Sequence, residues 1–119
     1  MSNLGDILSA LMQQEGTLAA AVIDGNSGQV LGKTGSADGL DMAARINSGV
    51  LRPKLHGIKK LEIEEHIEDM AITTTDHYHL VTFIQTHPGF FIYTALARHA
   101  GNLGAARYAA SHAQRQIQL

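Results

Sequence analysis

The 119-residue chain is long enough for one domain with a real hydrophobic core and too short for two such domains. Its hydrophobic content of 45% and charged content of 17% exclude intrinsic disorder, and its net charge of −2 gives no general reason to expect nucleic acid as a partner. The absence of cysteine excludes disulfides and thiolate metal sites. The longest early apolar run, residues 18–23, is much shorter than the about 20 residues of a membrane span, so we expect a soluble, cytoplasmic protein without membrane insertion.

The N-terminal segment predicts a narrow amphipathic helix. Apolar residues between Leu4 and Met12 follow helical spacing and cover an arc of roughly 140°. Ser2 or Asn3 can cap its first turn, and Gly16 is expected to end it. A helix with this arc covers one surface only.

The next segments predict a β-hairpin. Residues 17–24 (TLAAAVID) form a strand of the buried type, and residues 29–34 form its partner. The connection, residues 25–28 (GNSG), supplies residues that tolerate the positive φ of a tight turn. The three alanines at 19–21 indicate that another element, such as a helix, packs close over this strand.

The stretch from Leu40 to Ile58 predicts a helix with an unusually wide apolar face. Its apolar residues cover an arc of roughly 220°, whereas a surface helix buries a stripe of roughly 100°. We attribute the excess to a second packing partner. Pro53 is expected to bend or break this helix. The remaining arc is mainly basic and fits the docking of an acidic partner or phosphate as well as it fits a solvated helix face; its candidate residues are Arg45, Arg52, His56 and Lys59.

The C-terminal half predicts three strands and a helix. The strands are residues 67–74, 78–86 and 90–98, and the short turns between them indicate an antiparallel meander. Asn102 caps a last helix that runs to Ile117 with a one-sided arc of roughly 120°. Five antiparallel strands with apolar residues on both faces require helices on both faces of the sheet.

Motifs that suggest chemistry are weak. Gly32, Lys33 and Thr34 look like the end of a phosphate-binding loop, but the first glycine of that motif is missing and the segment is expected to be strand. His77 and His79 share a strand face, whereas His87 lies at the far end of the same strand, about 26 Å from His79 at ~3.3 Å per residue, and cannot share a metal ion with it. We therefore expect histidines of turns and rims, with no metal, no cofactor and no catalytic residue.

An acidic run precedes the meander and is expected to be a solvated connection rather than part of a specific ion pair. Its members are Glu62, Glu64, Glu65, Glu68 and Asp69.

Three segments in this order resemble the roadblock/dynein light chain family over nearly the whole chain. They are AAAVIDGNSGQVLG, DMAITTTDHYHLVTFI and FFIYTALARHAGNLGAARYAASHAQRQI. The resemblance implies one α/β (α+β) domain over residues 1–119: a profilin-like sandwich whose five-stranded antiparallel sheet has the order 2-1-5-4-3, with one long helix on one face and two on the other.

The resemblance also implies a homodimer in which the third strands pair edge to edge and the long middle helices pack on each other. Carried onto this sequence, the interface residues are Leu40, Ala43, Ala44, Ile46, Asn47, Val50, Leu51, Ile67, Met70, Ala71, Ile72 and Thr73. The implied role is a non-catalytic platform that binds a Ras-like small GTPase or another signalling protein. Two alternatives are a small-ligand sensor of the profilin-like or PAS-like type, with its ligand under the middle helix, and a histidine-based metalloenzyme.

Overall fold

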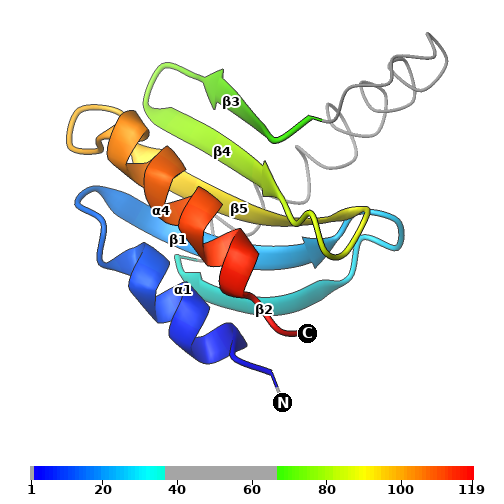
Figure 1. Ribbon diagram of the computed structural model, residues 1–119. Helices are drawn as coiled ribbons and strands as arrows, with labels where there is room; N and C mark the ends of the chain where they lie inside the picture. The colour runs from blue at the N-terminus through cyan, green and yellow to red at the C-terminus, as the bar shows by residue number, and fades with distance from the viewer. Residues whose placement is uncertain (1, 37–66) are drawn as a thin grey trace, which may run out of the picture.

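The computed structural model describes residues 2–36 and 67–119. In these residues a five-stranded antiparallel sheet has the strand order β2-β1-β5-β4-β3. The strands are β1 (Thr17–Asp24), β2 (Val30–Gly35), β3 (Asp69–Thr73), β4 (His77–Phe83) and β5 (Phe90–Ala97). Two helices, α1 (Leu4–Met12) and α4 (Leu103–Gln116), lie side by side on one face of the sheet (Figure 1). The predicted fold class and strand order are confirmed, whereas the helix predicted over 40–58 lies outside the described residues.

The last strand occupies the middle of the sheet. β5 pairs with β1 on one side, where Val22 faces Ile92, and with β4 on the other, where Val81 faces Tyr93. The interiors of both central strands are buried, as expected of continuous apolar runs. β2 and β3 are left as the two edges.

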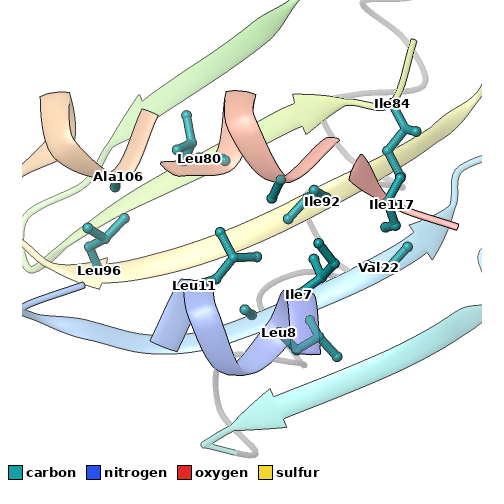
Figure 2. Packing of buried hydrophobic residues seen from close by; sticks show 13 residues of the cluster. Ile7, Leu8, Leu11, Val22, Leu80, Ile84, Ile92, Leu96, Ala106 and Ile117 are labelled. Atoms are coloured by element: carbon teal, nitrogen blue, oxygen red, sulfur yellow. The ribbon is translucent and has the colours of Figure 1, made fainter. Parts of the chain in front are cut away.

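The two helices and the sheet face beneath them enclose one hydrophobic core. In Figure 2, Ile7 and Leu11 of α1 point toward Val22 and Ile92 of the sheet. α4 contributes mainly small side chains, and Ala106 and Ala110 are at most 2% exposed. The alanines allow the helix backbone to approach the strands closely.

The opposite face of the sheet is equally apolar. Val81, Phe91 and Tyr93 are at most 1% exposed and pack in a second cluster with Ile23 and the neighbouring alanines. Both described helices lie on the other face, so neither supplies the cover that this second face requires (Figure 1). No helix among residues 2–36 and 67–119 is long and apolar enough to cross a membrane.

The N-terminal helix ends earlier than predicted. α1 stops at Met12, and the Gln13 amide donates to the Ala10 carbonyl. Gly16 instead lies in the turn before β1 with φ of +81°, at a point where a Cβ would lie 2.5 Å from the backbone of Gly101. The glycine is therefore required by a backbone crossing and not by the end of the helix.

Of the two caps predicted for α1, Ser2 bonds to a first-turn amide and Asn3 does not. The Asn3 side chain makes no capping bond; its amide donates to the Gln116 carbonyl at 2.8 Å and its oxygen accepts from the Gln118 amide at 2.7 Å. Ser2 Oγ accepts from the Leu4 amide at 3.3 Å. In α4 the predicted cap is confirmed, because the Asn102 side chain accepts from the Ala105 amide at 3.0 Å.

Replacing Gly16 with alanine should destabilise the protein by at least about 2 kcal/mol, because a side chain at positive φ is strained and would meet the Gly101 backbone. Urea unfolding measures the change. The matched control is Gly5→Ala: a Cβ at Gly5 has open space within α1, so its free energy of unfolding should stay unchanged or rise by up to about 1 kcal/mol. Equal stabilities of the two variants would contradict the crossing as the reason for Gly16.

Candidate protein-interaction surfaces

β3 is an edge strand of the described sheet. It pairs with β4 in the register that places Met70 opposite Val81 and Ile72 opposite His79. Its other side carries no strand among the described residues. An unpaired strand edge offers a row of backbone donors and acceptors to another chain, which makes it a candidate interaction surface.

The start of β3 is tied to α4 by an ion pair. Arg107 contacts Asp69 through two hydrogen bonds, from Nη2 at 2.7 Å and from Nε at 3.0 Å. The side chains are 49% and 24% exposed, so the pair contributes only about 0–1 kcal/mol to stability. Its two-point geometry nevertheless fixes where the strand begins. The expectation that the acidic run is only solvated is wrong for Asp69.

The end of β3 is tied to the centre of the sheet by a series of hydrogen bonds that runs from the exposed Thr74 to the buried Tyr93. The Thr74 hydroxyl lies 3.3 Å from the His77 carbonyl and 3.1 Å from His79 Nε2, and His79 Nδ1 lies 2.8 Å from the Tyr93 hydroxyl. Because a carbonyl can only accept, the Thr74 hydroxyl donates to it and accepts from Nε2–H. Nδ1 is then unprotonated and accepts from Tyr93, which fixes the neutral tautomer of His79.

The surroundings of His79 and Tyr93 oppose a charge on either side chain. His79 is 4% exposed and Tyr93 is fully buried. Burial lowers the pKa of His79, and the nearby His77, with ring centroids 5.7 Å apart, lowers it further. Burial also raises the pKa of the Tyr93 hydroxyl above its ordinary range. This series of hydrogen bonds is therefore a neutral structural network, and the prediction that the histidines belong to turns and rims is wrong for His79.

The predicted interface residues divide between the described part of the chain and the rest. Met70, Ala71, Ile72 and Thr73 lie on β3, and Ile67 precedes it. Met70 and Ile72 share the sheet face of His79, whereas Ala71 and Thr73 share the face covered by the helices. The other predicted interface and partner-binding residues lie outside the described residues; they are Leu40, Ala43, Ala44, Arg45, Ile46, Asn47, Val50, Leu51, Arg52, His56 and Lys59. The ligand site proposed under the middle helix falls there as well.

Gly32, Lys33 and Thr34 lie within β2, as expected for a strand and not for a phosphate-binding loop. Among residues 2–36 and 67–119, no three His, Asp or Glu side chains are grouped so that they can hold a metal ion.

Comparison with known proteins identifies the architecture. No family model and no curated protein matches the sequence. Among solved structures, a roadblock/LC7 domain from Streptomyces avermitilis superposes with a TM-score of 0.74 at 16% identity, over 92% of this chain and 89% of that domain. MglB from Myxococcus xanthus gives 0.71 at 15% identity over 95% and 92% of the two chains, and MglC from the same organism gives 0.64 at 18% over 95% and 94%. The chain therefore has the roadblock fold, in agreement with the resemblance seen in its sequence.

The buried histidine makes stability depend on pH. Unfolded His79 takes up a proton near pH 6.5, whereas the folded pKa is lower, so the unfolded state binds more protons as the pH falls below about 6.5. The free energy of unfolding should therefore be highest above this pH and fall below it. Urea unfolding between pH 8 and pH 5 should show a smaller fall for His79→Gln, whereas His99→Gln, at an exposed position, should retain the wild-type slope. Identical slopes for wild type and His79→Gln would exclude this histidine as the cause.

The ion pair should limit motion at the start of β3. We expect the Arg107→Gln variant to lose about 0.2–1 kcal/mol of stability. Its β3 amides near Asp69 should exchange faster with deuterium than those of the wild type. Arg115→Gln removes a charge from the same helix without breaking this pair and should leave that exchange unchanged. Equal amide exchange at the start of β3 in the two variants would refute the ion pair as a restraint on this strand.

Proposed function

We propose that this roadblock-fold chain is a non-catalytic scaffold that forms a homodimer and binds a protein partner, in the first place a Ras-like small GTPase. The observation that carries the proposal is the outer edge of β3, which pairs with no strand among residues 2–36 and 67–119. This strand is held at one end by Arg107 and at the other by the hydrogen bonds that join Thr74, His79 and Tyr93. A strand held in this way is preorganised to pair with another chain, since little entropy is lost when it does so.

In the proposed dimer the two β3 strands pair antiparallel across a twofold axis and join the sheets of both chains. Isologous pairing of this kind needs the same edge from each copy, which β3 provides. The helix expected over 40–55 packs on its counterpart and thereby buries the excess of its apolar arc. Met70 and Ile72 then continue the apolar face of the sheet toward the axis.

The partner class comes from the roadblock resemblance, which implies regulation or scaffolding of small GTPases, motor chains or signalling complexes. The fold shared with MglB, described in Thermus thermophilus as a gliding protein, supports a regulatory role. We assign Arg45, Arg52, His56 and Lys59 as candidate partner-binding residues, in a single cytoplasmic domain over residues 1–119. A basic surface of this kind mainly sets the orientation and rate of association with an acidic partner.

A charge introduced on β3 should break the dimer. Ile72→Lys places an ammonium group at the edge proposed to pair, so we expect a monomer or insoluble protein in light scattering at micromolar concentration, where the wild type is a dimer. Val30→Lys is the matched control, because Val30 is 42% exposed on the opposite edge strand and its substitution should retain the dimer. A stable wild-type monomer, or a normal dimer of Ile72→Lys, would rule out this edge.

Partner binding is tested separately by calorimetry with purified small GTPases of the source organism, each loaded with GDP or with a non-hydrolysable GTP analogue. We expect binding that prefers one nucleotide state and weakens in Arg45→Glu or Arg52→Glu. If no GTPase binds in either state, the GTPase assignment fails while the dimer remains to be judged by its own experiment.

A further inference from the structure

A polar pocket lies between α4 and the strands β3 and β4. It encloses about 240 Å³. Thr82 lies on the same face of β4 as Leu80 and Ile84, which pack against the helices, so the pocket is on the helix-bearing face of the sheet. Its polar lining comes from the start of β3, from β4 and from the last turns of α4, and includes Glu68, Asp69, Thr82, Ser111, Gln114 and Arg115.

The floor of this pocket has hydrogen-bonding groups that the protein leaves unused. Gln114 is 9% exposed, and its Oε1 accepts from the Gln85 amide at 3.0 Å, which fixes the orientation of the carboxamide. The Nε2 group of Gln114 has no acceptor among residues 2–36 and 67–119, yet it is not closed off from solvent. The Thr82 hydroxyl is buried and also lacks a described partner. Because buried polar groups are normally paired, the floor suits a molecule that brings acceptor atoms.

The rim of the pocket carries opposite charges that do not pair with each other. Arg115 donates from Nη2 to Ser111 Oγ at 3.1 Å, and no carboxylate of the described residues pairs with it. Glu68 is exposed and makes no ion pair among the same residues. Asp69 pairs with Arg107, but each of its oxygens keeps a lone pair for a further donor. The helix side of the pocket therefore offers an unpaired guanidinium, and the strand side offers carboxylates.

We propose that this pocket binds a free α-amino acid as a zwitterion. The carboxylate of the ligand accepts from the Arg115 guanidinium and from Gln114 Nε2, and its ammonium group donates to Glu68 and Asp69. A lone anion would leave the strand side of the pocket without a partner, and a lone cation would leave the guanidinium and amide donors without one. At ~30 Å³ per water the pocket holds about eight waters, which is the size of an amino acid and too small for a nucleotide.

The site is independent of the proposed dimer and of a GTPase partner, because all of its lining residues belong to one chain. A bound amino acid joins the start of β3 to the end of α4, beside the Arg107–Asp69 ion pair. Saturation with the ligand should therefore slow deuterium exchange of the β3 amides near Asp69 and leave the exchange of the β2 amides unchanged. Unchanged exchange at the start of β3 would contradict the proposed position of the ligand.

Calorimetry tests the ligand class with the full chain and each common L-amino acid in turn at millimolar concentration. We expect at least one of them to bind. Its amide derivative, which lacks the carboxylate, and its N-acetyl derivative, which lacks the ammonium group, should each bind at least about tenfold more weakly. Absence of binding by every amino acid would overturn the proposal. Equal binding of the N-acetyl derivative would also overturn it, because the site would then recognise the carboxyl terminus of a peptide.

Substitutions locate the ligand in this pocket. Gln114→Glu keeps an oxygen for the Gln85 amide and replaces the Nε2 donors by a second carboxylate oxygen, so binding should weaken at least about tenfold. Gln116→Glu makes the same change at an exposed position outside the pocket and should retain the wild-type affinity. Glu68→Gln, at an exposed position of the rim that tolerates substitution, should also weaken binding, whereas Glu15→Gln should not. Wild-type affinity in both Gln114→Glu and Glu68→Gln would refute the site.

Discussion

The fold depends on one constraint: the two central strands are apolar on both faces, so the sheet must be covered from both sides. Ala20 and Val22 of β1 face the helices, whereas Ala21 and Ile23 face the opposite side, and all four are at most 2% exposed. α1 and α4 satisfy the first requirement with narrow apolar faces and small side chains. The second requirement is met by neither of the described helices.

The edge strand is held in a way that suits it to pairing. A strand of five residues at the border of a sheet has few hydrogen bonds of its own and would open readily. Here an exposed two-point ion pair holds one end, and neutral hydrogen bonds from the exposed Thr74 to the buried His79 and Tyr93 hold the other. The first contributes geometry more than free energy, whereas the second is costly to break because it would leave buried polar atoms without partners. Together they hold β3 in place at the edge of the described sheet.

Local patterns predicted most of the fold. The limits of β1 and the asparagine cap of α4 follow from short-range chemistry, and the meander follows from its turns. The pairing of β5 with β1 came from the resemblance, since no local signal joins strands so far apart in the chain.

The role of His79 was missed because its burial and its bond to Tyr93 depend on the register across two strands. The end of α1 was misplaced for a similar reason. A glycine is required at position 16 by the close approach of the Gly101 backbone, 85 positions later in the chain. The structure describes the half of the candidate interface on β3, whereas the half predicted as helical lies outside the described residues.

The insertion of β5 between β1 and β4 has a consequence for folding. The hairpin of β1 and β2 is local, and so is the meander of β3 to β5, but the sheet is completed only when residues 90–97 reach β1. Bringing residues 90–97 to β1 closes a long loop of chain, which is slow compared with forming either hairpin. During synthesis the strand TLAAAVID therefore waits with one unpaired edge and two apolar faces, a state that favours aggregation and association with chaperones.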